Sequence, residues 1–450
     1  MARTPKIAII GGGIAGLAAA VAFHRRGIDA TIYEQAPELS EIGAGVQMTP
    51  NAMKALKSLG LEQAAMAVAF EPESQVLRSW KSGRVIYRAP VSGFRERFGA
   101  PGCSFHRADL LSILAAPLPA SAVQLNARCV GVEPGTNSAV ARFADGTEIT
   151  ADIVVGADGI HSLVRTQLFG ADQPRFTGCM CWRGLVPVDR IPKGLIERSS
   201  SNWMGPHGHV VHYYVRRGEM VNFVAIHDTD EWTEESWIRE ASRDELMATY
   251  AKWNPRLLRL FECSDRYFKW GLFDREPLSR WTEGRITLLG DSAHAMLPFL
   301  AQGAAMGIED GCALAELVAR QPDDLDEALR RYEALRVPRT RRAVLGSRER
   351  AKLNHLPSRW ARFKRDVEYL SRRVFYPDGT AHRVAWLYGY DIAASEHYAP
   401  QSPSPPPGGG EGRGEVRDAR ALADTHFTLP VAPRRVPSLS PLQGGEGKLG

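Results

Sequence analysis

The sequence predicts an α/β protein with three parts: a Rossmann-like domain on a parallel sheet, an inserted and mainly antiparallel β domain, and C-terminal helices. Three observations predict this fold. Short apolar runs alternate with helical patterns through the first 400 residues. A glycine-rich segment follows the first apolar run. Between about 175 and 275 the runs become alternating and rich in aromatic residues, which is typical of an antiparallel sheet with one covered face.

The expected elements follow from these patterns. Four short apolar runs are expected to form the parallel sheet: Lys6–Ile10, Ala30–Tyr33, Ile153–Val155 and Arg285–Leu289. In the inserted domain we expect strands at His209–Val215 and Met220–Ile226. From Leu325 to about Arg373 the pattern is helical and basic, and we interpret it as a solvated helical face. A docking surface for an anionic ligand and an oligomer contact are the alternatives.

The predicted domains are discontinuous. The Rossmann-like domain is expected to comprise residues 1–75, 100–172 and 270–345, with the inserted domain at 76–99 and 173–269 and a helical region at 346–400. Residues 401–450 are rich in proline and glycine and repeat similar blocks, so we expect a disordered tail that cannot bury a core.

Composition excludes several classes of protein. A mean hydropathy of −0.24 argues against an integral membrane protein. A net charge of +5 is small for 450 residues, so nucleic-acid binding is not predicted. The six cysteines are scattered, and Cys179 and Cys181 lack a second pair at zinc spacing. We therefore expect a reduced, cytoplasmic protein with no metal site.

The strongest motif is a strand that leads through Gly11–Gly16 into an alanine-rich helix. In this Gly-x-Gly-x-x-Gly pattern, Gly11 permits the tight turn, Gly13 lets the backbone approach a pyrophosphate, and Gly16 lets the helix pack closely on the strand. Glu34 lies at the end of the second strand, 18 residues beyond Gly16, where an acid can hold ribose hydroxyls. These features predict an adenine-dinucleotide site. A turn that merely packs a helix, with Glu34 as a surface carboxylate, is the alternative.

Two further segments follow apolar runs. Gly156–Gly159 is by itself only a turn. In the second segment Asp291 ends a strand, and a loop rich in proline and glycine leads to a helix near Gly303. That carboxylate can bind a polyol hydroxyl, and the helix start can stabilise negative charge on a bound ring. A serine-hydrolase interpretation of Gly290–His294 is disfavoured because the second glycine of the nucleophile elbow is absent.

Together these motifs resemble the single-component FAD-dependent aromatic hydroxylases of the para-hydroxybenzoate hydroxylase fold. Within that group the chain is most similar to the salicylate hydroxylase and 3-hydroxybenzoate 6-hydroxylase branch. Supporting stretches lie at Gly43–Ala52, His106–Leu110, Arg183–Gly184 and Trp386–Asp391. The resemblance covers about residues 5–395. It implies that the Rossmann-like domain binds FAD, that NADH or NADPH is the co-substrate, and that the inserted domain binds the substrate.

The resemblance also implies roles for individual residues. The cofactor-binding positions that it implies are Gly11, Gly13, Ala15, Gly16, Glu34, Gln35, Gln47, Arg107, Val130, Asp158, Asp291, Gly303 and Ala304. A structural salt bridge or turn is the alternative role for Arg107 and Asp158. His209 matches a histidine proposed as the phenol-activating base in the 3-hydroxybenzoate branch, and Tyr213 matches a pocket position on the same strand. An ordinary polar strand residue is the alternative for His209. A metal site of His207, His209 and His212 is disfavoured, because on a strand the third side chain points to the other face.

The activity that the resemblance implies is hydroxylation of a small phenolic aromatic acid, of the salicylate or hydroxybenzoate type, by a flavin hydroperoxide formed from dioxygen. Pro298 and Gln47 depart from residues typical of the 3-hydroxybenzoate and 6-hydroxynicotinate enzymes, so the ring substrate stays open. The alternatives are a larger aromatic or polyketide substrate, an epoxidase, and a non-catalytic binding protein of the same fold. We expect a monomer or homodimer.

Overall fold

The computed structural model describes residues 4–39, 44–230, 241–375 and 379–399. The predicted tail at 401–450 and the first residue of the Gly43–Ala52 stretch lie outside the described residues. The described residues all belong to one compact unit, Met1–Ala399. The domain boundaries within it therefore stay a prediction.

The parallel sheet contains all four strands that the apolar runs predicted. It has six strands in the order β17 (Thr282–Glu283), β18 (Ile286–Leu288), β11 (Ile153–Gly156), β1 (Ile7–Ile10), β2 (Ala30–Tyr33) and β7 (Val123–Gln124). Only the edge pair β17–β18 is antiparallel. Strands β1, β11 and β18 are buried along their whole length, as expected for a sheet covered on both faces. The predicted motifs follow β1, β2, β11 and β18, so they gather at the carboxyl edge of the sheet, where open α/β sheets bind ligands.

The antiparallel sheet forms where the alternating pattern predicted it. Its seven strands run in the order β16 (Phe268–Asp274), β12 (Arg175–Pro187), β15 (Met220–Asp228), β14 (Gly208–Val215), β13 (Ser200–Gly205), β4 (Ser74–Ser79) and β5 (Val85–Pro90). Its two faces differ. One face packs in a core with Leu246 of α7 (Arg243–Thr249), with Tyr250 directly after that helix, and with Phe261 of α8 (Pro255–Glu262). The other face carries Cys181 and Ile226 and packs against Leu297.

Two smaller sheets and the remaining helices complete the described chain. Strand β3 (Gly45–Met48) pairs with β6 (Cys103–His106), and β8 (Cys129–Pro134), β9 (Ala139–Phe143) and β10 (Glu148–Ala151) form a three-stranded sheet. The helices are α1 (Ile14–His24), α2 (Pro50–Ser58), α3 (Glu62–Val68), α4 (Phe94–Phe98), α5 (Arg107–Ala115), α6 (Leu163–Phe169), α9 (Asp291–His294), α10 (Gly303–Arg320), α11 (Leu325–Asn354), α12 (Arg359–Phe375) and α13 (Gly379–Tyr388). Short 3₁₀ turns are η1 (Ala120–Ala122), η2 (Val188–Arg190), η3 (Arg216–Gly218), η4 (Pro298–Leu300) and η5 (Ser395–Tyr398).

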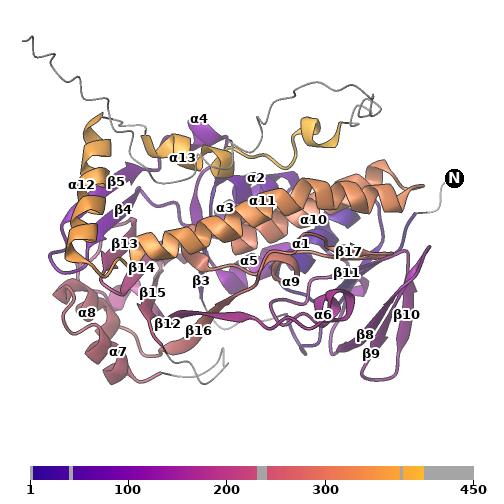
Figure 1. Cartoon of the computed structure of the whole chain (residues 1–450), viewed down its shortest axis with the longest axis horizontal. Helices are drawn as coiled ribbons and strands as arrows, with labels where there is room; N and C mark the ends of the chain where they lie inside the picture. Colours follow the sequence, from indigo (N-terminus) through magenta and orange to yellow (C-terminus); the bar gives the residue numbers. More distant parts are fainter. Residues whose placement is uncertain (1–3, 40–43, 231–240, 376–378, 400–450) are drawn as a thin grey trace, which may run out of the picture. The chain divides into compact units, whose positions relative to one another are not determined.

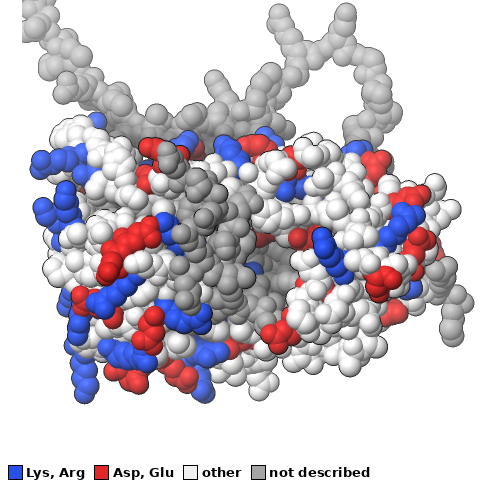
Figure 2. Space-filling model, turned by 90° about the horizontal axis from the view of Figure 1, so that it is seen from below, with Lys and Arg blue, Asp and Glu red and all other residues white. Residues whose placement is uncertain are grey.

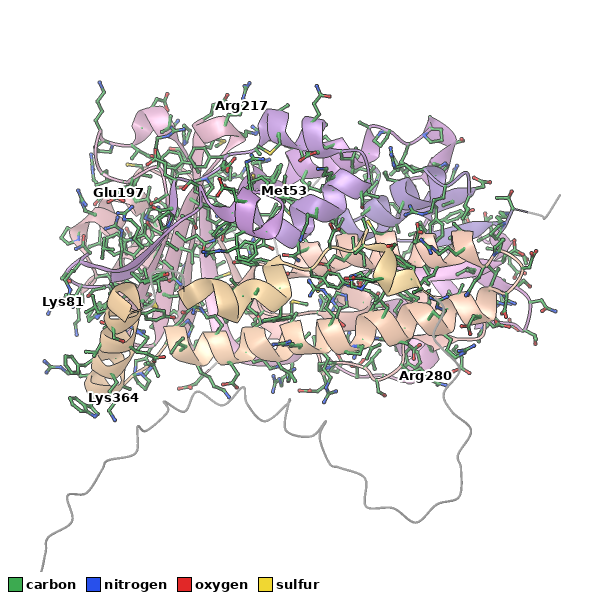
Figure 3. The ribbon with its side chains drawn as sticks, turned by 90° about the horizontal axis from the view of Figure 1, so that it is seen from above. Met53, Lys81, Glu197, Arg217, Arg280 and Lys364 are labelled. Atoms are coloured by element: carbon green, nitrogen blue, oxygen red, sulfur yellow. The ribbon has the colours of Figure 1, made fainter. Side chains whose placement is uncertain are left out.

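The long helix α11 links the two large sheets. It runs from beside the parallel sheet to the antiparallel sheet, where its C-terminal end lies near β14 (Figure 1). In the view from above, α11 runs alongside α13, and α2 carries the labelled and buried Met53 (Figure 3). The predicted helical stretch is divided between Asn354 and Arg359, and Pro357 lies in this gap, where proline removes a backbone donor and disfavours helix in the residue before it. Pro338, in contrast, is accommodated within α11.

The prediction that α11 presents a solvated basic face is wrong for its central arginines. Arg336 is fully buried and Arg339 nearly so, because Glu309 and Asp310 on the buried face of α10 need cationic partners. On the face seen in Figure 2, Lys and Arg are interspersed with Asp and Glu. No helix among the described residues is long and apolar enough to cross a bilayer.

Candidate active site

The glycine-rich turn between β1 and α1 brings backbone segments unusually close together. Gly11 has a φ of +109°, and a Cβ there would lie 2.4 Å from the carbonyl oxygen of Ala157. A Cβ on Gly16 would lie 2.1 Å from the carbonyl oxygen of Gly11. At Gly13, in contrast, a Cβ would meet no described atom within 4 Å, so space is open beside the turn. No described side chain caps α1 and its first turn contains no acid, which leaves N–H groups for an anion such as a pyrophosphate.

Glu34 is held beside this turn by two backbone amides. Its Oε2 accepts a hydrogen bond from Gly12 N at 2.6 Å, and its Oε1 accepts one from Ala36 N at 2.8 Å. A carboxylate fixed in this way keeps further lone pairs for ribose hydroxyls. Gln35 is exposed, and Val130 on β8 is 46% exposed. Among the described residues, no hydrogen bond joins the Gln35 side chain to the turn, and the apolar Val130 side chain has no group that could form one.

The carboxylate of Asp158 forms its hydrogen bonds within its own segment of the chain. Asp158 follows β11, and its carboxylate accepts hydrogen bonds from Ser162 Oγ at 2.5 Å and Val164 N at 3.1 Å. Burial raises its pKa, although these hydrogen bonds oppose the rise. This geometry supports the turn role that the sequence left open for Asp158.

The segment around Gly290 and Asp291 lies against the glycine-rich turn at Gly11–Gly16. A Cβ on Gly290 would lie 2.7 Å from the Cβ of Ala15, and one on Gly307 would lie 2.8 Å from it. Asp291 begins α9 and is exposed, and its Oδ1 would lie 3.8 Å from a Cβ at Gly303, the first residue of α10. No acid and no described side-chain cap occupies the start of α10. Gly303 and the half-buried Ala304 therefore leave a second helix terminus open to negative charge.

Arg107 lies close to this edge. It begins α5, and its backbone N–H donates to Ala44 O at 2.8 Å. Burial lowers the pKa of the Arg107 guanidinium, whereas the charge of Asp291 raises it and the charge of Arg183 lowers it further. Arg107, Asp291 and Arg183 are thus electrostatic neighbours, although they come from three separate segments of the chain. Ser292 is not placed as a nucleophile, because its buried hydroxyl donates to Gly156 O and Leu289 O.

The substrate-side residues lie on the face of the antiparallel sheet opposite to α7 and α8. His209 and Tyr213 share this face of β14, as their even spacing requires. Strand β3 approaches the face so closely that a Cβ on Gly45 would lie 2.7 Å from the Tyr213 ring and from Asn222. Gln47, also on β3, donates through Nε2 to Ser200 Oγ at 2.9 Å. Gln47 therefore joins β3 to the sheet.

Several buried polar atoms on this face have no hydrogen-bond partner among the described residues. They are Arg183 Nε, Asn202 Oδ1 and Asn222 Nδ2. An unsatisfied buried polar group costs about 1–3 kcal/mol, so such a group is usually satisfied by water or a ligand. Arg183 also stacks on Trp270, with its guanidinium carbon 4.2 Å from the ring centre. Arg183 belongs to one of the stretches that carry the family resemblance, but the resemblance implied no role for it.

His209 is buried against aromatic neighbours. It is 1% exposed, its ring packs edge-on against Phe299 of η4, and its Nδ1 lies 2.6 Å from Nε2 of His355. Burial lowers the pKa of His209 well below its usual value, and the nearby His355 and Arg350 lower it further. The imidazole is therefore neutral at physiological pH and can accept a proton. Burial raises the pKa of Tyr213 to about 12, so its hydroxyl stays protonated.

The other two histidines lie apart from His209. His212 points to the opposite face of β14, as predicted. His207 is not on the strand at all, since it occupies the turn before β14 with a φ of +56°. The expectation that His207 lies on the strand is therefore wrong.

Cys179, Asp228 and His355 form a different cluster, in which potential ligand atoms lie within 4.8 Å of one another. His355 Nδ1 is in hydrogen-bond contact with Asp228 Oδ1, too close for both atoms to surround an ion. Burial, together with the charge of Asp228, raises the pKa of the Cys179 thiol to about 12, so the thiol stays protonated. We interpret this cluster as hydrogen-bonded.

Comparison with known proteins agrees with these features. A family model described as an FAD binding domain matches residues 4–347. The chain belongs to this family. It is 41% identical over 393 residues to the 3-amino-4-hydroxybenzoate 2-monooxygenase PtnB3 of Streptomyces platensis, covering 86% of this chain and 97% of the relative. It is 35% identical to the 3-hydroxybenzoate 6-hydroxylase of Polaromonas naphthalenivorans (strain CJ2), covering 86% and 96%.

A solved structure supports the same assignment. Klebsiella pneumoniae HpxO, in complex with FAD and uric acid, superimposes with a TM-score of 0.77 at 28% identity, covering 86% of this chain and 98% of that one. The predicted fold, the FAD cofactor and the class of enzyme are confirmed. The protein is an FAD-dependent monooxygenase. The resemblance to the 3-hydroxybenzoate branch is confirmed, whereas the similarity to the 3-amino-4-hydroxybenzoate enzymes was not predicted.

Proposed function

We propose that the protein hydroxylates a small aromatic acid that carries a ring hydroxyl, such as a hydroxybenzoate, using NADH or NADPH and dioxygen. The observation that carries this proposal is a buried, neutral imidazole, His209, on the same sheet face as the cation Arg183. A phenolic acid has one group for each of them, a hydroxyl that can lose a proton and a carboxylate. The two curated relatives act on benzoates with a ring hydroxyl, by their names.

The chain's own residues have distinct tasks in this proposal. Arg183 binds the substrate carboxylate, and His209 accepts the proton of the ring hydroxyl, which makes the ring electron-rich. Tyr213 keeps its proton and donates a hydrogen bond to the substrate. Leu297 and Phe299 pack against the same face and exclude water from it.

The residues present fit FAD, and we propose how they hold it. Gly11, Gly13, Ala15, Gly16 and Glu34 would bind its ADP part, supported by the open space at Gly13 and the held carboxylate of Glu34. The other proposed contacts are Gln35, Gln47, Arg107, Val130, Asp158, Asp291, Gly303 and Ala304. Bound FAD, once reduced by NADH or NADPH, supplies the activation of dioxygen.

The test is oxidation of NADH and NADPH by the FAD-loaded protein with a panel of ring acids. The panel contains 3-hydroxybenzoate, salicylate, 3-amino-4-hydroxybenzoate and 6-hydroxynicotinate, with benzoate as the matched compound that lacks the hydroxyl and urate as a heterocycle without a carboxylate. We expect one hydroxylated acid to stimulate oxidation and to yield hydroxylated product in proportion to the NAD(P)H consumed. Stimulation by urate alone, or by none of these compounds, would contradict the proposal and direct the search to heterocycles or larger substrates.

We also propose that the protein works in the cytoplasm as a monomer or homodimer. All six cysteines are free thiols, as a reducing compartment requires. Size-exclusion chromatography with light scattering measures the oligomeric state.

A further inference from the structure

A chain of hydrogen-bonded side chains leads from His209 towards the surface. His209 Nδ1 lies 2.6 Å from His355 Nε2, and the other nitrogen of His355 contacts the carboxylate of Asp228. These residues come from β14, from the end of α11 and from the end of β15, so only the fold brings them together (Figure 1). The Asp228 side chain is 34% exposed and lies 3.7 Å from the 59% exposed His207.

The hydrogen bonds determine which nitrogen carries each proton. An ionised carboxylate only accepts hydrogen bonds, so His355 must donate to Asp228 through Nδ1. Neutral His355 then offers Nε2 as an acceptor, and His209 must donate to it through Nδ1. The remaining nitrogen of His209, Nε2, is therefore an acceptor. This tautomer is the one that a base for a phenolic proton requires.

Positive charge is better tolerated at His355 than at His209. His209 is fully enclosed, and burial disfavours its charged form. His355 follows the last turn of α11, where its N–H donates to Ala351 O and the negative end of the helix dipole stabilises a cation. Burial raises the pKa of Asp228, but the hydrogen bonds from His355 and Cys179 oppose this, and the pKa is lowered overall. Asp228 is therefore available as a counter-ion.

The other titratable and charged groups that face this chain are few. Arg350 of α11 acts on His209, and Cys179 of β12 donates to Asp228 at 3.5 Å. His207 faces Asp228 from the turn before β14. The pKa of His227 on β15 is affected by the charges of both Asp228 and His355. The arginine and the two neighbouring histidines disfavour a second positive charge, whereas Asp228 offsets the one on His355.

We propose that His209, His355 and Asp228 form a proton relay that ionises the substrate hydroxyl, which rests on the proposed function. The O–H bond of the ring hydroxyl breaks and its proton bonds to His209 Nε2, while the proton on His209 Nδ1 passes to His355 Nε2. The products are a ring oxyanion, a neutral His209 and a His355 imidazolium paired with Asp228. Asp228 and His207 then connect this proton to solvent. His209 is the catalytic base, and His355 and Asp228 act through it.

The test measures ionisation of a bound phenol without turnover. The FAD-loaded protein, with no NAD(P)H, is titrated with 3-hydroxy-4-nitrobenzoate, whose phenolate absorbs in the visible range, and difference spectra are recorded against pH. We expect His355→Gln to raise the apparent pKa of the bound phenol by about one unit or more, and to slow the appearance of the phenolate in stopped flow about tenfold. Asp228→Asn, which preserves the shape of the side chain, should shift both quantities in the same direction.

The matched control is His227→Gln. His227 neighbours Asp228 in sequence and acts on it only through its charge, because its side chain lies on the opposite face of β15. Its substitution should therefore change both quantities much less than either relay substitution does. Circular dichroism and FAD content of each variant show whether the fold is retained. If the wild type binds and ionises the probe and both relay variants behave like it, the relay is wrong while the hydroxylase proposal stands. The zinc content of the purified protein is measured as well. Stoichiometric zinc in the wild type that is lost in His355→Gln would mean that His355 is a metal ligand, and it would also overturn the relay. If the wild type neither binds the probe nor responds to any hydroxylated acid, the proposed function itself fails.

Discussion

Two networks of polar side chains in this protein each join a histidine to a carboxylate, but the carboxylates have different further partners. In the helical network, Asp310 contacts His294 at 2.6 Å and Arg336 at 2.7 Å, and Arg336 also contacts Glu309 at 2.8 Å. Arg339 adds a second cation to Glu309 at 2.7 Å. In the sheet network, His209 contacts His355, which contacts Asp228, and no arginine forms an ion pair with Asp228 among the described residues.

The presence of arginine in one network and its absence from the other, among the described residues, suits the two networks to different roles. Arginine does not lose its proton, so the helical network keeps its charges fixed. Burial would raise the pKa of Asp310, but His294 and Arg336 lower it to about 2. The sheet network instead consists of groups that exchange protons, and it ends at a partly exposed carboxylate. The first network holds α9, α10 and α11 together, whereas the second can carry a proton.

The largest effect is expected from opening the helical network. Arg336→Met leaves Glu309 and Asp310 short of a partner at fully buried positions, and breaking a buried ion pair in this way costs about 3–5 kcal/mol. Urea unfolding of the FAD-loaded protein measures the loss. Arg341→Met, at an exposed position of the same helix, is the control and should change stability by at most about 0.5 kcal/mol. Equal stability of the two variants would contradict a framework role.

Removing the base of the sheet network should reduce catalysis more than stability. We expect His209→Gln to lower kcat by about 100-fold near neutral pH, within the usual range for general-base catalysis. The deficit should shrink as the pH rises, because the hydroxyl of the substrate then ionises without a base. A pH profile of kcat for wild type and variant checks this. A loss that is independent of pH would indicate a packing role for His209 instead.

The sequence predicted the framework strands well and the long-range polar contacts poorly. The predicted runs Ala30–Tyr33 and Ile153–Val155 correspond to β2 and β11 within one residue, because buried strands between glycine turns have a strong local pattern. His355 was not anticipated. It lies 146 residues from His209, and nothing in the sequence around it signals that the end of α11 reaches the sheet.

The error on Arg336 has a different cause, because a signal was present. Glu309 and Asp310 lie within an otherwise apolar stretch of α10, and buried acids need cationic partners. A nearby basic helix was therefore the place to look for buried arginines. Arg183 was missed for a third reason, since only the structure reveals that its Nε is buried without a partner on the substrate face among the described residues.

A moderate effect is expected where the helices of the framework touch. A Cβ on Gly311 of α10 would lie 2.7 Å from the backbone N and Cα of Ala19 on α1. We expect Gly311→Ala to destabilise the protein by about 1–3 kcal/mol, since overpacking outweighs the gain of about 1 kcal/mol in helix propensity. Gly346→Ala on α11 meets only a flexible leucine side chain at 3.2 Å and is the control. Thermal unfolding compares them, and stabilisation by Gly311→Ala would refute the close contact.

The smallest effect at neutral pH, and the sharpest in its pH dependence, concerns a buried histidine that belongs to neither network. His212 is 1% exposed, both ring nitrogens lack a hydrogen-bond partner among the described residues, and burial lowers its pKa to about 3, helped by Arg78. Glu197, labelled in Figure 3, pairs with Arg78 at 2.6 Å and only partly offsets this. The unfolded chain binds a proton at His212 below about pH 6.5, but the folded chain does so only near pH 3. Stability therefore falls as the pH drops through this window, by about 1.4 kcal/mol per unit for one proton.

Replacing His212 by leucine, which has a similar volume and no titratable group, removes that proton difference. Urea unfolding between pH 8 and pH 5 should show His212→Leu to be at least as stable as wild type at pH 8, because two unpartnered buried nitrogens are removed, and its advantage should grow as the pH falls to 5. Parallel curves at all pH values would mean that His212 titrates normally in the folded protein. His209→Leu tests the same principle in the sheet network, where the neighbouring imidazole can share the proton. A smaller gain at low pH for His209→Leu than for His212→Leu would then measure how far His355 and Asp228 already accommodate that charge.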